Sequence, residues 1–109
     1  MIVNKYQIFI GLNDSVTRQQ MHSTEIFQKI VCNVCKGYRV AFSVSDLHGG
    51  YFHDDGTFVA ENSLCLTLIG ADDAMVNEIA EDICAFFHQE SVLVMKSEAD
   101  CRFVQNSLE

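Results

Sequence analysis

The sequence contains no proline and no tryptophan, and it has only six glycines among 109 residues. A chain without proline is neither collagen-like nor a proline-built linker. No apolar run approaches the roughly 18 uninterrupted residues that a membrane-spanning helix needs, and no basic segment followed by an apolar stretch marks a secretion signal. We therefore expect a cytoplasmic protein without a membrane partner.

Basic residues are also scarce. Seven Lys and Arg stand against fifteen Asp and Glu, which gives a formal net charge of −8. Generic nucleic-acid binding requires surplus Lys and Arg, so no direct nucleic-acid partner is expected. The charge is uneven, because residues 1–53 hold five bases and three acids whereas residues 54–109 hold two bases and twelve acids.

The chain has an odd number of cysteines, five, and two of them form the CxxC sequence Cys32–Cys35. Reactive CxxC pairs lie at the start of a helix, where the helix dipole lowers the thiol pKa. This pair falls in the last turns of a predicted helix, where the dipole acts in the opposite sense. Reduced, structural thiols are the expected state.

Hydrophobic periodicity predicts two helices and at least four strands. Apolar residues recur at helical spacing over residues 20–36 and again from about residue 73 to His88. Alternation of apolar residues predicts strands over 6–12, 39–45, 57–69 and 91–95, with a short extra strand over 101–104. The turn-rich segment Asp46–Gly56 is predicted to be a loop.

The order strand–helix–strand–strand–helix–strand predicts one α+β domain over residues 1–109. Right-handed crossovers convert this order into a four-stranded antiparallel sheet with both helices on one face, the ferredoxin-like fold. The terminal Ser107–Glu109 is read either as native sequence or as the remnant of an affinity tag.

Two helices on one face leave the other face of the sheet uncovered. The residues predicted to point there are small or apolar: Phe9, Ala41, Ser43, Cys65, Thr67 and Ile69. Such a face is too apolar for full solvation, so we expect a homo-oligomer, either a dimer or a trimer. The alternatives are a monomer with a mixed open face and a C-terminal segment that folds over it.

The segment from His48 to Gly56 holds the densest chemistry, and no catalytic residue is assigned in the chain. Its candidate ligand or partner contacts are His48, Tyr51, Phe52, His53, Asp54 and Asp55. The candidate ligands of a divalent metal are His48, His53, Asp54 and Glu61. Their spacing matches no specific zinc or calcium motif, and the alternative is a solvated hairpin. No other cofactor is expected.

The order of predicted strands and helices resembles that of the PII/CutA-like group of small ferredoxin-like proteins. The matching region is Asp46–Gly56, where that group carries a long loop between its second and third strands. The resemblance implies self-association through the sheets and binding of nucleotides, anions or metals between subunits. The segment holds no Lys or Arg, in departure from the phosphate-binding pattern of PII proteins.

The chain also resembles, more loosely, a bacterial family of unknown function. The similar segments are Tyr6–Leu12, Glu61–Leu64 and Gln89–Leu93. This resemblance implies the same fold and no particular mechanism.

The leading functional hypothesis is a non-enzymatic, self-associating regulatory module that binds a small ligand or metal at clefts between subunits. The alternative is a small acidic inhibitor, similar to phage anti-CRISPR proteins, that blocks the basic nucleic-acid-binding surface of a protein partner. Its candidate contacts are the second helix's acids Glu78, Glu81 and Asp82. An enzyme acting through His48 and His53 is the third hypothesis.

Overall fold

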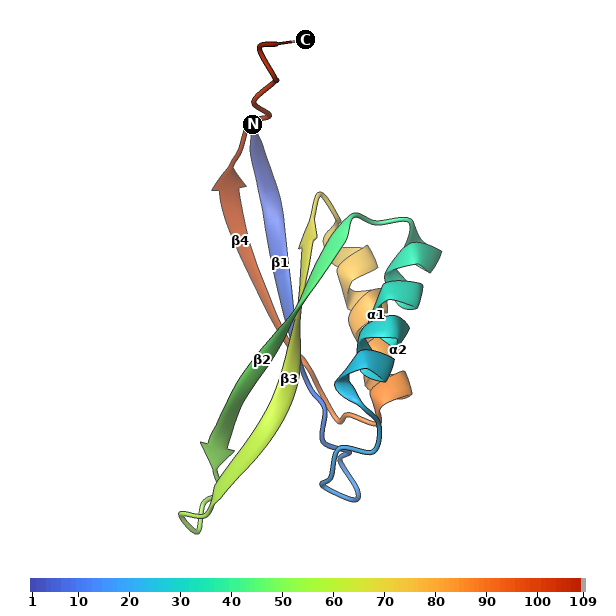
Figure 1. Ribbon diagram of the computed structural model, residues 1–109, viewed down its shortest axis with the longest axis vertical. Coiled ribbons are helices and arrows are strands. Elements are labelled where there is room, and N and C mark those ends of the chain that lie inside the picture. Colours follow the sequence, from blue (N-terminus) through green and yellow to red (C-terminus); the bar gives the residue numbers. More distant parts are fainter. Residues whose placement is uncertain (109) are drawn as a thin grey trace.

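The computed structural model describes residues 1–108; Glu109, the end of the suspected tag remnant, lies outside them. The elements follow in the order β1 (Ile2–Gly11), α1 (Thr24–Tyr38), β2 (Phe42–Phe52), β3 (Phe58–Ile69), α2 (Asp73–Phe87) and β4 (Leu93–Asp100). The strands form one antiparallel sheet with the order β2-β3-β1-β4, and both helices cover the same face of it (Figure 1). The predicted ferredoxin-like α+β fold is confirmed.

Each helix begins at a side chain that caps its first turn. The hydroxyl of Ser23 accepts a hydrogen bond from the backbone N–H of Ile26, and the carboxylate of Asp72 accepts one from that of Met75. The first helix therefore begins at Thr24, and the predicted start near residue 20 was wrong. Both helices end at a residue with positive φ, Arg39 and His88.

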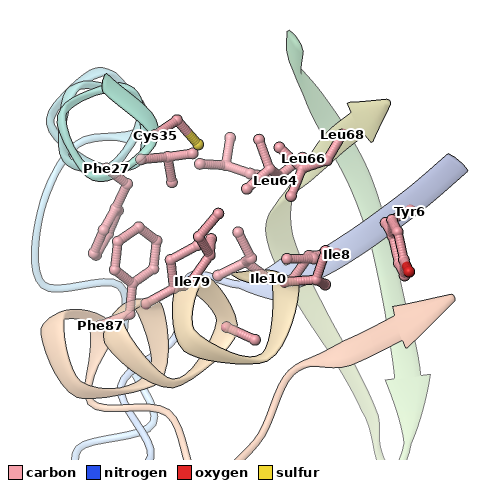
Figure 2. Close-up of a cluster of buried hydrophobic side chains, with 14 of the residues drawn as sticks. Tyr6, Ile8, Ile10, Phe27, Cys35, Leu64, Leu66, Leu68, Ile79 and Phe87 are labelled. Atoms are coloured by element: carbon pink, nitrogen blue, oxygen red, sulfur yellow. The ribbon is translucent and has the colours of Figure 1, made fainter. Parts of the chain in front are cut away.

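The core lies between the two helices and the sheet face that they cover. The ring centroids of Phe27 from α1 and Phe87 from α2 are 4.6 Å apart. Figure 2 shows both rings on the helix side of the core, across from the leucines of β3. The fully buried side chains are Ile8, Ile10, Leu12, Val31, Cys35, Leu64, Leu66, Leu68, Val76, Ile79 and Ile83. Two residues predicted in the helical stripes, Ile26 and Phe86, are instead 46% and 61% exposed.

The strands differ from their predicted bounds mainly outside the part of the sheet that the helices cover. β2 continues to Phe52, which pairs with Phe58 of β3, so most of the predicted loop Asp46–Gly56 is strand. β4 runs to Asp100, and the predicted extra strand over 101–104 is absent from the described chain. The β2–β3 hairpin thereby projects beyond the ends of the helices (Figure 1). Within residues 1–108 no helix has the length and apolar character to cross a membrane.

Candidate functional site

A polar cleft of about 500 Å³ lies where the β2–β3 hairpin leaves the body of the protein, the part in which the helices cover the sheet. Its walls come from the hairpin, the loop after β1 and the connection between α2 and β4. The lining residues are Asn13, Asp14, Ser15, Arg18, Tyr51, His53, Val59, Glu61, Gln89, Glu90 and Ser91. Segments far apart in the sequence thus meet at one end of the sheet.

Glu61 is a carboxylate that the fold holds in place in this cleft. Its Oε2 accepts a hydrogen bond from the backbone N–H of Asn13 at 3.0 Å. The side chain lies over Gly11, because a Cβ built there would be 2.7 Å from the Glu61 carboxylate. Its cross-strand neighbour is a second glycine, Gly49. Gly11 leaves room for a half-buried carboxylate that one backbone amide holds in place, whereas a Cβ at Gly49 would meet only open space.

Aromatic side chains of the hairpin form the wall beside Glu61. The rings of Tyr51 and His53 meet edge to face with centroids 5.5 Å apart, and Val59 is the cross-strand partner of Tyr51. Tyr51 is 46% exposed. A planar ring bound in the cleft would therefore have an aromatic surface to pack against.

The loop after β1 forms the opposite wall and is fixed by Asp14. Its carboxylate accepts hydrogen bonds from the backbone N–H groups of Val16 at 2.8 Å and Thr17 at 3.0 Å. These bonds, chiefly that from Thr17, hold the pKa of Asp14 below its usual value. The Asp14 carboxylate also lies 3.2 Å from Nδ1 of His88. Arg18 ends this turn with φ at 60°, a strained conformation for a non-glycine residue.

The cleft is poor in positive charge. Three acids line it, Asp14, Glu61 and Glu90, against one arginine, Arg18, and no lysine. Such a lining favours a neutral or cationic group near Glu61 and disfavours a polyphosphate.

The structure does not bring the four predicted metal ligands together. His48 and Glu61 lie on opposite faces of the hairpin, and Nδ1 of His48 is 2.9 Å from the Asn62 side-chain oxygen. Across residues 1–108, no three His, Cys, Asp or Glu side chains converge in a way that could hold a metal ion. Consecutive strand residues point to opposite faces, and this is why the candidates separate once the segment is strand.

Asp54 and Asp55 lie in the hairpin turn, away from the cleft. The carboxylate of Asp55 accepts a hydrogen bond from the backbone N–H of Thr57 at 2.8 Å, which lowers the pKa of Asp55. Gly56 has φ at 88°, so the predicted Asp–Gly turn is observed. Phe52 precedes the turn and is 72% exposed.

The acids of the second helix are not equally free to meet a partner. Glu78 and Glu81 are exposed, whereas Asp82 is half-buried and accepts a hydrogen bond from the hydroxyl of Tyr38 at 2.7 Å. This bond, with burial and the nearby acids, raises the pKa of Tyr38 to about 12. The inhibitor hypothesis stays a prediction, with Glu78 and Glu81 as its accessible contacts.

The hydrogen bond between Tyr38 and Asp82 predicts that the free energy of unfolding falls in alkaline solution. The tyrosine pKa is raised in the folded protein, so its stabilising effect is complete below pH 10 and is lost as the pH rises towards about 12. Thermal unfolding measured across this range should show a steeper loss in the wild type than in Tyr38→Phe, which has no proton to release. Equal slopes in the two proteins would contradict this assignment.

The uncovered sheet face carries the residues predicted for self-association. Phe9, Ser43, Cys65, Thr67 and Ile69 share that face in the observed register, and Ala41 lies beside them just before β2. Leu93 and Met95 of β4, which were not predicted, extend the apolar surface and are 59% and 50% exposed.

This open face is almost free of charge. Along the described strands, the register places only Lys5 and Glu61 as charged residues on it. Two copies of an acidic chain can therefore approach through this face without bringing their carboxylates together.

The CxxC pair has a structural environment. Cys35 is buried in the core, and burial raises the pKa of its thiol to about 11, with the neighbouring Cys32 adding to the effect. A thiol with a raised pKa is a poor nucleophile at neutral pH.

Sequence reasoning missed several cleft residues. Asn13, Arg18 and Glu90 carried no chemical motif of their own, and neither did Gly11, which lies next to the Glu61 carboxylate. The available signal was the turn sequence after the first strand, which marked a loop at the end of the sheet where ligands are often bound.

Comparison with solved structures reveals similar chains among both enzymes and other proteins. A phage SAM lyase in complex with S-methyl-5′-thioadenosine is 25% identical, with a TM-score of 0.69 over 88% of this chain and 81% of that one. CutA1 from Oryza sativa is 8% identical, with a TM-score of 0.61 over 93% and 84% of the two chains. The PII-like protein CPII from Thiomonas intermedia K12, bound to ADP, AMP and acetate, is 14% identical, with a TM-score of 0.53 over 90% and 86%.

The expected resemblance to the PII/CutA-like group is thus confirmed for the fold. The phage SAM lyase is an enzyme with a similar structure, so the expectation of a non-enzymatic protein stays a prediction. No curated protein sequence matches the chain. A family model matches residues 5–103, and the chain belongs to the family described as "Protein of unknown function (DUF3574)".

Proposed function

We propose that this protein is a self-associating module that binds an S-adenosyl sulfonium compound, such as S-adenosylmethionine, in the polar cleft around Glu61. The observation that carries the proposal is the fixed carboxylate of Glu61 in a cleft with an aromatic wall and a single arginine. A sulfonium is a cation, and a carboxylate held by a backbone amide is ready to pair with it.

The charge of the cleft supports this ligand over a nucleotide polyphosphate. Phosphate groups in protein sites are held by Lys, Arg or helix N-termini. Arg18 is the one such cation among the lining residues, and three acids line the cleft with it. S-adenosylmethionine carries an adenine ring for the Tyr51 wall and a sulfonium for Glu61, without any phosphate.

The likeness to the phage SAM lyase supports the same ligand class. It extends over 88% of this chain at 25% identity, and that protein was solved with S-methyl-5′-thioadenosine bound. Its ligand holds an adenosine joined to sulfur, which is the part that S-adenosylmethionine shares.

Self-association through the open face would place the cleft between copies. Glu61 lies on that face, at the end where the hairpin leaves the body. A second copy covering Phe9, Leu93 and Met95 would then extend to the margin of the cleft. This position agrees with the expectation of a ligand site between subunits.

Replacement of Glu61 tests the ligand. A charge-assisted contact contributes about 1.5–3 kcal/mol, so Glu61→Gln should weaken S-adenosylmethionine binding by about 10- to 150-fold in isothermal titration calorimetry. Gly11→Ala should weaken binding in the same direction, because its Cβ would displace the Glu61 carboxylate from a distance of 2.7 Å.

The matched control is Glu98→Gln, which removes the same charge from an exposed site on β4. It should bind as the wild type does. Tighter binding of ADP than of S-adenosylmethionine, or unchanged affinity in Glu61→Gln, would contradict the proposal.

A second candidate function is cleavage of the bound sulfonium, which the 25% identity to a lyase favours. S-methyl-5′-thioadenosine keeps the methyl and adenosyl groups, so the bond that breaks joins sulfur to the aminocarboxypropyl chain. The electron pair stays on sulfur, which becomes a neutral thioether, and the carbon fragment either loses a proton or bonds to its own carboxylate. Chromatography of S-adenosylmethionine incubated with the protein would reveal S-methyl-5′-thioadenosine, and its absence at saturating substrate would support a binding module.

A further inference from the structure

The projecting end of the β2–β3 hairpin carries two aromatic rings that nothing in the described chain covers. Phe52 and Phe58 pair across the strands with ring centroids 5.2 Å apart, and they are 72% and 56% exposed. Gly50 lies beneath the ring of Phe58, where any Cβ would collide with it and with the carbonyl of Val59. A single two-stranded hairpin is marginally stable in water, so this end of the hairpin needs a partner surface.

An apolar socket of about 460 Å³ lies at the same end of the body, between the loop after β1, the beginning of α1 and the end of α2. Its apolar lining comprises Leu12, Val16, Met21, Phe27, Phe86 and Phe87. Val16, Met21 and Phe86 are 84%, 55% and 61% exposed, although they line a concave surface. The molecule therefore exposes both an aromatic projection and an apolar cavity.

The charges of the two features are complementary. The hairpin turn adds Asp54 and Asp55, which follow Phe52 after His53. The socket is bordered by His22 and His88, with Arg18 in the same loop, and its one acid, Asp14, has a carboxylate only 12% exposed. In a chain with a net charge of −8, the socket therefore presents few exposed carboxylates to the acids of the hairpin turn.

We propose that Phe52 and Phe58 of one copy dock into the apolar socket of a second copy. The docking rests on the self-association proposed above and adds a second contact to the open face. Two aromatic side chains bury about 300–500 Å², which is less than the roughly 1,200–2,000 Å² of a stable interface. The open sheet face would supply the remaining area. The tip and the socket are different surfaces, so their contact is heterologous and forms a ring if the rotation between copies closes.

Separate variants of the tip and of the socket test this docking. The tip variant Phe52→Ser/Phe58→Ser and the socket variant Val16→Asp should each weaken association by at least about 100-fold in analytical ultracentrifugation. Val16→Asp changes a loop residue and leaves the hairpin intact, so it tests the contact even if the tip variant loses its hairpin. Phe103→Ser, at a phenylalanine 90% exposed in the C-terminal tail, is the control and should associate normally.

Mixing the two variants gives the sharpest result. The socket variant has an intact tip and the tip variant an intact socket, so fluorescently labelled copies should associate with each other but not with themselves. Failure of the mixture to associate would overturn the docking. A tip variant that associates like the wild type, while the open-face variant Leu93→Asp does not, would overturn the docking alone; a monomeric wild type would overturn the proposed self-association as well.

Discussion

Replacing Leu66 with Ala is expected to lower the free energy of unfolding by about 2–5 kcal/mol. Leu66 is fully buried on β3, between Ile8 of β1 and Val44 of β2, on the face that both helices cover. The shorter side chain would leave a cavity, because the sheet register prevents the two flanking strands from moving in to fill it. A domain of this size has a total stability of about 5–15 kcal/mol, so chemical denaturation should detect the change easily.

Ile26→Ala is the matched control, since it removes a similar apolar side chain from a site that is 46% exposed on α1. The loss there should stay below about 1 kcal/mol, because little buried surface is removed and Ala favours the helix. Comparable losses at the two positions would mean that the core does not lie where the structure places it.

The body of the fold was predictable because its elements bury one face each. The leucines at positions 64, 66 and 68 alternate with residues of the open face, and Phe27, Val31 and Cys35 recur at helical spacing. Burial on one side produces these periods, so the order of elements followed from them. Ile26 and Phe86 were misassigned because an apolar stripe read from sequence can be wider than the surface that the sheet covers.

The end of the β2–β3 hairpin was not predictable, because it lacks the one-sided burial that produces an alternating pattern. From Leu47 to Phe52, β2 extends beyond the helices and buries neither face, so no alternation marks it as strand. Its glycine pair and polar residues instead favoured a loop.

The cleft also depends on long-range pairing that sequence spacing does not reveal. Glu61 was recognised as a candidate ligand of a metal, but its contacts with Gly11 and Asn13 require β1 to pair with β3 at one particular register. Those contacts turn it from one acid among many into a positioned carboxylate.

Placing a charge on the open face should abolish self-association. Leu93 is 59% exposed and pairs with Phe9 of β1 at the start of the edge strand β4, within the apolar surface. In Leu93→Asp, association would bury a carboxylate without a partner, which costs about 3–5 kcal/mol and weakens binding by at least about 100-fold. Sedimentation velocity over a range of concentrations should then show a monomer. The circular dichroism spectrum should match that of the wild type, because the fold is retained.

Val104→Asp adds the same charge at a tail residue that is 82% exposed, and it should leave the oligomer intact. Because the Glu61 cleft lies at the margin of the open face, Leu93→Asp should also reduce ligand affinity, although Leu93 is not among the residues that line the cleft. Ligand binding that survives dissociation would show that one copy forms a complete site. An oligomer that tolerates Leu93→Asp would show instead that copies meet through a different surface, since a buried, unpaired carboxylate is incompatible with a packed apolar interface.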